Sequence, residues 1–283
     1  LDGEYLTFEV IDGHASYFVT IDGISYDVDK FEGFWLDHPT LPEVLERYDN
    51  PEYRRFIDKQ FFTAREGLRY LFGERKWMND PARMAIVNNK IFQATVALRA
   101  GFTLPETVVT SDPRKIMDLS IRSGGKIITK ILSPSPILDQ VILTKVLSED
   151  QLKNIDSAMY CPAIYQPYIE KDYELRITVV GEKIFAAKID SQADEGTRVD
   201  WRARPKFNDT EARMQLIEIP TFLKETIRKF MGMCGLRYGA IDMIVTPGGE
   251  YIFLEINPNG QWYFVQLQSE AEIADAIAEL LMT

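Results

Sequence analysis

Histidine and cysteine are scarce in this chain of 283 residues, which contains two of each. Cys161 and Cys234 form no CxxC or Cys/His cluster, so the sequence predicts neither a disulfide framework nor a thiolate metal site. His14 and His38 both lie near the start of the chain, which leaves little material for a histidine-centred triad or a zinc site. Any chemistry must therefore depend on carboxylates, lysines and arginines.

Long apolar runs and an excess of basic residues are also missing. No run approaches the ~20 apolar residues of a membrane helix, and the opening LDGEYLTFEV lacks the features of a signal peptide. We therefore predict a cytoplasmic protein with no membrane partner. The net charge of -11 argues against a nucleic-acid partner, because binding to phosphates requires a basic surface.

The acidic excess belongs to the N-terminal region. Residues 1–60 contain 14 Asp or Glu against 5 Lys or Arg, a balance of -9, which leaves -2 for the rest of the chain. We interpret it as a solvated acidic surface. The numbering begins in a strand-like segment without an initiating methionine, so we expect that part of the native N-terminus is missing.

Local patterns in residues 1–80 predict a small N-terminal α/β domain. The pairs Asp12-Gly13 and Asp22-Gly23 interrupt alternating apolar and polar residues, a pattern typical of β-hairpins. From Pro42 to Phe72 the apolar residues recur at helical spacing, which predicts a helix or a helix pair.

The remaining sequence alternates helices, strands and hairpins, which predicts an α+β fold with mixed sheets. A helix should begin near Lys90 and end at Gly101, and Ser148 offers a capping box to another helix. We divide this part into a central subdomain, residues 81–165, and a C-terminal subdomain, residues 166–283. Further expected elements are helices at 113–122, 219–234 and 269–281, a hairpin at 174–190, and strands at 240–246 and 251–257.

Three oxygen-bearing side chains are concentrated in the last predicted hairpin. Asp242 lies on one strand, and Glu255 and Asn257 are two residues apart on the next, so all three should share one face. Plain alternation would also put Phe253 on this face. Such a set of hard ligands suits Mg²⁺, or alternatively Mn²⁺, which would bridge the phosphates of ATP. An ordinary solvated sheet face is the competing interpretation.

Two lysines occur where an anion would explain them. Lys130 interrupts the β-branched run KIITKIL, where a charge is costly unless it is paired, and a triphosphate would provide the pairing. Lys90 follows Asn88-Asn89 at a helix N-terminus, a position that favours anions. Either lysine alone is better explained as an edge-strand or surface charge, and only the carboxylate hairpin beside them favours a phosphate site.

The segment IYQPYIEKDYELR combines an apolar start with charged residues. The stretch Gln166, Pro167, Tyr168 and Ile169 could place backbone groups along an adenine edge, because Pro167 kinks the chain. Glu174 and Arg176 share a face of the following strand. The guanidinium of Arg176 matches an acyl-phosphate oxyanion, although a cross-strand ion pair would also account for it.

The order of these pieces resembles the ATP-grasp superfamily, in which the nucleotide lies between two α+β subdomains. Within it, WMNDPARMAIVNNKIFQATVALRAGFTLPET, YQPYIEKDYELRITVVG and RVDWR look like the microviridin-type graspetide ligases, which mature ribosomally made peptides. The resemblance extends from about Phe34 to the end of the chain. The carboxylate hairpin indicates the superfamily, whereas KDYELR and VDWR indicate the subfamily.

The resemblance implies a site and a reaction. It assigns Lys90, Lys130 and Glu174 to the nucleotide, Arg176 to the acyl phosphate, and Asp242, Glu255 and Asn257 to Mg²⁺. Enzymes of this kind use ATP to phosphorylate an Asp or Glu side chain of a precursor peptide. A Thr, Ser or Lys side chain of the same peptide then attacks, forming an ω-ester or ω-amide macrocycle. Positioning and charge neutralisation are sufficient for this chemistry, so no His or Cys nucleophile is required.

An arginine-rich segment, residues 190–209, offers contacts for an acidic peptide. Arg198, Arg202 and Arg204 are candidate carboxylate clamps in an otherwise acidic protein. Pairing of Arg198 and Arg202 with acidic residues of the same segment is an equally good interpretation. The expected partner is a precursor peptide with a leader and an acidic core, and a homodimer is left open.

Two other functions compete with the peptide macrocyclase. A RimK-like carboxylate–amine ligase would add a free amino acid to a protein or small-molecule carboxylate. A regulatory ATP-binding module would have lost turnover, although the complete set of metal-ligand candidates argues against it.

Overall fold

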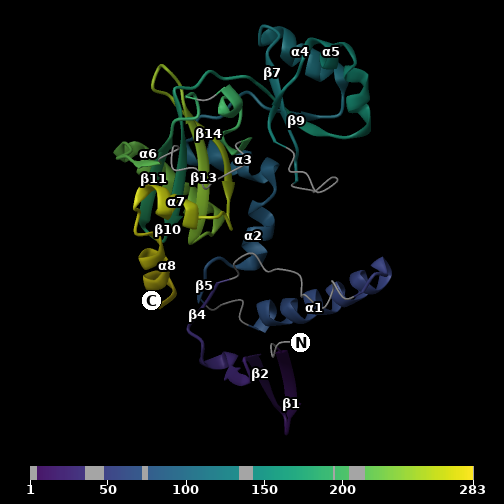
Figure 1. Ribbon diagram of the computed structural model, residues 1–283, viewed down its shortest axis with the longest axis vertical. Helices are drawn as coiled ribbons and strands as arrows, with labels where there is room; N and C mark the ends of the chain where they lie inside the picture. Colours follow the sequence, from purple (N-terminus) through teal and green to yellow (C-terminus); the bar gives the residue numbers. More distant parts are fainter. Residues whose placement is uncertain are drawn as a thin grey trace. The chain divides into compact units, whose positions relative to one another are not determined.

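The computed structural model describes residues 5–35, 48–71, 76–133, 143–193, 195–203 and 214–282 (Figure 1). The chain divides into two compact units, which are treated separately below. One comprises Leu1–Pro81 with Ala278–Thr283, and the other comprises Ala82–Ile277.

A three-stranded antiparallel meander opens the first unit. Its strands, in spatial order, are β1 (Tyr5–Ile11), β2 (His14–Ile21) and β3 (Ile24–Asp27). Both connecting turns are Asp-Gly pairs with positive φ, at 52° and 80° in the first and 52° and 76° in the second. Positive φ at both central residues matches the twist of the paired strands, so the predicted hairpins are confirmed.

The first unit also contains a long helix and a two-stranded parallel pair. Helix α1 (Pro51–Leu71) falls inside the predicted helical range, part of which lies outside the described residues. Strands β4 (Gly33–Phe34) and β5 (Lys76–Trp77) pair in parallel. A small apolar cluster is centred on Tyr17, Val28 and Trp77.

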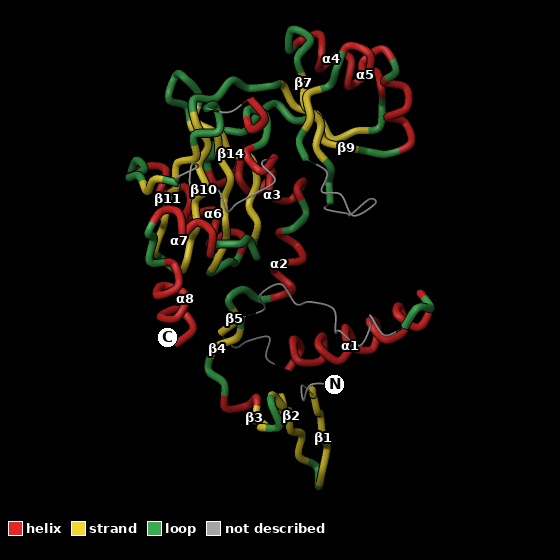
Figure 2. The backbone as a smooth tube through the Cα atoms, viewed as in Figure 1, coloured by secondary structure: helices red, strands yellow, loops and turns green. Residues whose placement is uncertain are grey.

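A five-stranded antiparallel sheet is the larger sheet of the second unit (Figure 2). Its order is β12-β11-β10-β13-β14, so β14 is an edge strand. The strands are β10 (Tyr173–Val180), β11 (Lys183–Ile189), β12 (Gln215–Leu216), β13 (Tyr238–Val245) and β14 (Tyr251–Asn257). Strands β10 and β11 confirm the predicted hairpin at 174–190.

Two helices, α3 (Lys90–Ala100) and α6 (Thr221–Cys234), cover one face of this sheet and bury the main core against it. Strand β10 contributes Leu175, Ile177 and Val179 to the core, and β13 contributes Ile241, Met243 and Val245. The intervening residues, among them Glu174, Arg176 and Asp242, therefore point to the opposite face. This alternation places the polar side chains of the predicted site together.

A second, four-stranded sheet has the order β6-β9-β7-β8. Its strands are β6 (Val108–Thr110), β7 (Ile127–Lys130), β8 (Lys145–Val146) and β9 (Ala163–Pro167). Helices α4 (Pro113–Arg122) and α5 (Glu149–Lys153) accompany it, and Ile116, Leu119, Ile127 and Tyr165 form its core. Because both sheets pack against helices, the α+β prediction is confirmed.

Helix ends follow the predicted signals. The Asn89 side chain caps α3 by accepting from the N–H groups of Ile91 and Phe92, so the helix begins at Lys90 as expected. Gly101, with φ of 110°, ends this helix. Ser148 and Gln151 form the predicted capping box of α5.

The remaining helices are α2 (Pro81–Val87), α7 (Tyr263–Ser269) and α8 (Ile273–Met282). The single closing helix predicted for 269–281 is therefore wrong in extent. Glu270 adopts φ of 59° and ends α7, so the chain restarts as a separate helix at Ile273. Among the helices that the structure describes, none is long and apolar enough to cross a bilayer.

Candidate functional site

A cavity of about 630 Å³ is lined by both sheets of the second unit. Strands β7 and β9 supply one side, and β10, β13 and β14 supply the other. Its size lies within the usual range for small-molecule sites. Within the described part of the chain, four carboxylates and four cations line it: Glu174, Asp200, Asp242, Glu255, Lys90, Lys130, Lys171 and Arg202.

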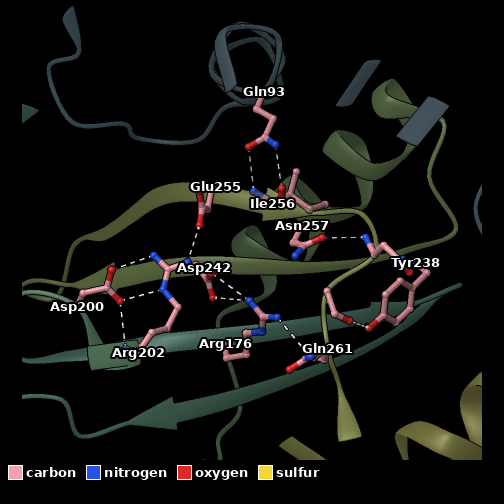
Figure 3. A network of polar contacts seen from close by, with 12 residues as sticks. Gln93, Arg176, Asp200, Arg202, Tyr238, Asp242, Glu255, Ile256, Asn257 and Gln261 are labelled. Carbon is pink, nitrogen blue, oxygen red and sulfur yellow. Dashed lines mark hydrogen bonds and ion pairs between the residues drawn. The ribbon is translucent and has the colours of Figure 1, made fainter. Parts of the chain in front are cut away.

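The predicted oxygen cluster lies in the wall of this cavity (Figure 3). Asp242 on β13 is directly opposite Glu255 on β14, and Asn257 is two residues farther along β14, opposite Ala240. Residues opposite each other on antiparallel strands project to the same face, so the two carboxylates are neighbours. The Asn257 carboxamide oxygen accepts from the N–H of Asn259 at 3.0 Å.

A β-bulge changes the face on which Phe253 lies. The register shifts between Asp242 and Met243, so that Met243 is opposite Phe253 and Leu254 is the extra residue. Phe253 and Ile256 consequently both belong to the apolar core. Plain alternation predicts Phe253 on the same face of the strand as Glu255. That prediction is wrong, because a bulge reverses the side-chain alternation.

Arg176 on β10 is directly opposite Asp242 and forms an ion pair with it. Its Nη1 donates to both carboxylate oxygens, at 2.9 and 3.0 Å, and its Nη2 donates to the Gln261 carbonyl at 3.2 Å. Burial raises the pKa of the Asp242 carboxyl, against the lowering effect of Arg176. The cross-strand ion pair considered for Arg176 therefore exists, with Asp242 as its partner.

Glu255 is the anionic partner of two cations. The Lys90 ammonium donates to one of its oxygens, and Nη1 of Arg202 lies 3.4 Å from the other. Burial alone would raise the pKa of Glu255, but Lys90 and Arg202 outweigh burial and hold it below the usual value. Lys90, predicted to bind the nucleotide, and Glu255, predicted to bind the metal, are thus in direct contact.

Lys130, at the end of β7, faces the same cavity. Burial lowers the pKa of its ammonium, and the neighbouring charges of Lys90 and Arg202 lower it further, whereas Glu255 raises it. An anion bound beside this buried ammonium would stabilise its charged form strongly.

Asp200 fixes Arg202 at the edge of the cavity. Nε and Nη2 of Arg202 each donate to an Asp200 oxygen at 2.9 Å, and the N–H of Thr144 lies 3.3 Å from that carboxylate. Burial acts to raise the pKa of Asp200, but the hydrogen bonds from Arg202 reverse this and lower it to about 2. Pairing of Arg202 within its own segment, one of the two interpretations left open, is therefore present.

Lys171 connects the segment between β9 and β10 to the arginine-rich segment. Its ammonium donates to Glu174 at 2.7 Å and to the Val199 carbonyl at 3.1 Å, and both members of the ion pair are buried. Burial raises the pKa of the Glu174 carboxyl, an effect that Lys171 opposes.

The predicted adenine segment also lines the cavity, through Gln166, Pro167, Tyr168 and Ile169. The amide nitrogen of Gln166 donates to the Thr107 hydroxyl at 2.9 Å. Its carbonyl oxygen is buried and has no hydrogen-bond partner among the described residues. A buried acceptor without a donor is costly, so a ligand amino group would be a favourable partner there.

A model of the RimK-like ATP-grasp domain matches residues 87–281 of the chain. The chain belongs to this ATP-grasp family. A probable alpha-L-glutamate ligase of Vibrio atlanticus is 23% identical over 207 residues, which cover 72% of this chain. The aligned stretch spans 66% of that relative's length.

Two solved ATP-grasp structures match nearly the whole chain. A RiPP-associated ATP-grasp ligase of Chryseobacterium gregarium, in complex with ADP and a leader and core peptide, has a TM-score of 0.86 at 27% identity. This match covers 99% of this chain and 85% of that chain. The macrocyclase MdnC of Microcystis aeruginosa, bound with its precursor peptide MdnA, has a TM-score of 0.82 at 29% identity, covering 98% and 86%.

The donor set of the ATP-grasp cavity fits a nucleotide with a hard divalent cation. Asp242 and Glu255 are adjacent carboxylates, and Asn257 adds an amide oxygen, which is the ligand chemistry of Mg²⁺. Among the residues that the structure describes, no cluster of three or more His, Cys, Asp or Glu that could hold a metal occurs.

Two of the three predicted substrate arginines, Arg198 and Arg202, line different hollows. Arg202 lines the ATP-grasp cavity, whereas Arg198 lines an adjoining hollow of about 410 Å³ with Lys126 and Gln192. Tyr168 and Lys171 line both. Arg204 lies outside the described residues. A common patch that includes Arg204 therefore stays a prediction.

Two polar residues of this region, Lys171 and Gln93, were missed in the sequence. Lys171 lies between Glu170 and Asp172, so nothing in this charged run indicates that its side chain is buried. Gln93 is only 4% exposed and binds the backbone of Ile256. A glutamine within a helical pattern gives no sign of this contact, because its partner is 163 residues away.

Proposed function

We propose that this chain is an ADP-forming ATP-grasp ligase that closes rings in a ribosomally made precursor peptide. It would phosphorylate an Asp or Glu side chain of the peptide and join it to a Thr, Ser or Lys side chain of the same peptide. The observation that carries this proposal is the convergence of Lys90, Lys130 and Arg202 on the paired carboxylates Asp242 and Glu255.

The comparisons support the peptide substrate. The Chryseobacterium and Microcystis ligases match 99% and 98% of this chain, including residues N-terminal to the ATP-grasp family match. Both are known with a precursor peptide bound. A match over the whole chain is a stronger indication of a shared substrate class than the nucleotide domain alone.

We assign the nucleotide to the cavity as follows. Lys90 and Lys130 would neutralise the phosphates, and Gln166 would accept from the adenine amino group with its unpartnered oxygen. Pro167, Tyr168, Ile169 and Glu174 would surround the base and the ribose. Asp242, Glu255 and Asn257 would hold Mg²⁺, with Mn²⁺ as the alternative. The bound ion would neutralise phosphate charge and align the phosphate chain.

The reaction would proceed in two balanced steps. The peptide carboxylate attacks the γ-phosphorus of ATP, so that an acyl phosphate forms and ADP leaves. A hydroxyl or amine of the same peptide then attacks the acyl carbon, loses its proton, and expels phosphate. Arg176, held beside Asp242, would neutralise the acyl phosphate, and Lys130 would neutralise the transferring phosphoryl group.

The arginine-rich segment would hold the peptide carboxylate before transfer. Arg202 is fixed by Asp200 and Glu255 at the cavity, where a guanidinium can bind a carboxylate in a forked geometry. Arg198 and Arg204 would bind acidic residues farther along the peptide.

Oxygen transfer tests this activation step directly. A precursor encoded beside the gene would be labelled with ¹⁸O in its Asp and Glu carboxylates and incubated with the protein, MgCl₂ and ATP. The released phosphate should carry one ¹⁸O per link, because the carboxylate oxygen leaves with phosphorus. Unlabelled phosphate would mean that ATP is hydrolysed by water and that no carboxylate is activated.

A carboxylate–amine ligase is the second candidate, favoured by the RimK-like family match and the Vibrio relative. It would activate a carboxylate in the same way but would use a free amino acid as nucleophile. Incubation with ATP and isotopically labelled glutamate separates the two. Label in the acceptor would support this candidate, whereas rings formed without label uptake support the macrocyclase.

Three further features belong to the proposal. The chain would consist of an N-terminal domain of residues 1–80 and two subdomains, residues 81–165 and 166–283. The nucleotide would lie between the two subdomains. The protein would act in the cytoplasm, where ATP and a newly made peptide meet. A homodimer stays open.

A further inference from the structure

Gln93 joins helix α3 to the edge strand that bears two of the proposed metal ligands (Figure 3). Its amide nitrogen donates to the Ile256 carbonyl at 2.8 Å, and its amide oxygen accepts from the Ile256 N–H at 3.1 Å. The same nitrogen donates to the Val87 carbonyl at 2.7 Å. One side chain thus satisfies three main-chain groups.

The paired contact with Ile256 imitates a neighbouring β-strand. Strand β14 is at the edge of its sheet, so none of the strands that the structure describes pairs with the outward N–H and C=O groups of Ile256. Ile256 is 2% exposed and Gln93 is 4% exposed, which keeps water from these groups. A primary carboxamide presents one donor and one acceptor side by side, the same pair that a strand residue would offer.

The position of this contact gives it a functional consequence. Ile256 lies between Glu255 and Asn257, whose side chains enter the cavity on the opposite side of the strand from the Ile256 side chain. Strand β14 is irregular at this place, because the bulge lies just before Glu255. A bulged edge strand has few ladder hydrogen bonds to fix it, and Mg²⁺ tolerates little error in ligand position.

The helix that carries Gln93 also carries Lys90, three residues earlier and on the same side of the helix. Lys90 binds the Glu255 carboxylate while Gln93 binds the adjacent peptide groups. Two side chains from the first turn of α3 therefore contact β14, one at a side chain and the other at the main chain.

We propose that Gln93 is a positioning residue, which holds the backbone of β14 so that Glu255 and Asn257 are spaced for a divalent cation. This inference rests on the proposed nucleotide and metal site. Gln93 itself would contact neither the cation nor the peptide.

The test compares Gln93→Met with Val96→Ala. Methionine keeps the length of the side chain but removes all three hydrogen bonds. Val96 is a buried core residue on the same helix, 6% exposed, so its truncation weakens the packing of α3 without removing these hydrogen bonds. Gln93→Glu, which keeps one accepting oxygen, provides a second variant if the methionine variant does not fold.

The first measurement is hydrogen exchange of the Ile256 amide without any ligand. In Gln93→Met this amide should exchange at least about tenfold faster than in the wild type. In Val96→Ala its exchange rate should stay within about twofold of the rate expected from that variant's loss of global stability. Equal acceleration in both variants, or none in either, would overturn the role of Gln93.

The second measurement is ADP binding as a function of MgCl₂ concentration. Gln93→Met should raise the half-saturating Mg²⁺ concentration roughly tenfold or more, with ADP affinity in EDTA unchanged. An unchanged Mg²⁺ requirement would contradict the inference. Wild-type protein that binds no ADP at any Mg²⁺ concentration would instead contradict the proposed function, so the two failures are distinguishable.

Discussion

At the scale of single residues, Glu255 is held by two cations from distant parts of the chain. Lys90 comes from the start of α3 and Arg202 from the arginine-rich segment. In the proposed function, the two cations would bind the nucleotide phosphates and Glu255 would bind the divalent cation. The charge of Glu255 would then serve the metal as it serves the two cations here.

Glu255→Gln should lower ATP turnover roughly 10²-fold or more, because it removes a charge from the phosphate site without changing core volume. The rate of ADP formation measures the effect, and circular dichroism should show an unchanged fold. Glu182→Gln is a matched control, since Glu182 forms an exposed ion pair with Arg228 at 3.2 Å, and both residues lie outside the described lining of the cavity. Normal turnover in Glu255→Gln would contradict a role for Glu255 in binding the nucleotide or its metal.

Asp200 makes a pH-dependent contribution to stability. Its folded-state pKa of about 2 is below the ordinary 3.8, so the charged form stabilises the fold above about pH 4. That contribution should be lost as the pH falls from about 4 to about 2. Asp200→Asn should reduce the free energy of unfolding by about 2 kcal/mol at neutral pH, measured by urea denaturation.

The difference between Asp200→Asn and wild type should shrink as the pH falls toward 2. Glu106→Gln is the control, because Glu106 pairs with Arg122 at the surface and should cost less than about 1 kcal/mol. A difference for Asp200→Asn that does not change between pH 5 and pH 2.5 would contradict a buried, charged Asp200.

At the scale of elements, the sequence predicted most local structure but not the local irregularity of the site. The Asp-Gly turns, the Asn89 cap and the Ser148 capping box were predictable because each depends on residues a few positions apart. The bulge before Glu255 was not, because it depends on how β14 meets β13 and the core. The same holds for Gln93, whose partners are distant in sequence.

The loop after β14 leaves no room for a side chain at Gly260. A Cβ there would lie 2.5 Å from the Ala240 Cβ and 2.8 Å from Nη2 of Arg176. Gly260→Ala should therefore displace Arg176, costing about 1–3 kcal/mol in stability and lowering turnover by up to roughly 10²-fold. Thermal denaturation and ADP formation measure the two effects.

Gly248→Ala is the matched control for this change. A Cβ at Gly248, in the turn between β13 and β14, would meet only Thr246 at 3.6 Å. Stability should stay within about 0.5 kcal/mol of wild type. If Gly260→Ala behaved like Gly248→Ala, the close approach of this loop to Arg176 would not exist in solution.

The Lys171–Glu174 pair ties two segments together, and its loss should be costly. Lys171→Met leaves Glu174 buried without a cation, which should destabilise the protein by about 3–5 kcal/mol in urea denaturation. Lys171→Met combined with Glu174→Leu should recover part of this loss, because no unpaired charge remains. A double variant as unstable as the sum of the single variants would contradict direct pairing.

At the scale of the whole molecule, the residue types of the chain restrict the chemistry that it can perform. Scarce histidine and cysteine point to carboxylates, lysines and arginines, and eight such groups from the described residues line one cavity. The substrate could not be deduced in this way, because charged cavity residues of these types suit phosphates in general and do not indicate a peptide. Arg198 and Arg202 illustrate the limit, because they are close in sequence yet line different hollows.

The central claim is that ATP is used to close rings within one peptide, and intact mass spectrometry of the precursor tests it most directly. With protein, MgCl₂ and ATP, the precursor encoded beside the gene should become lighter by one water per link, with one ADP formed for each. An unchanged mass, or a gain in mass from an added amino acid, would contradict the macrocyclase.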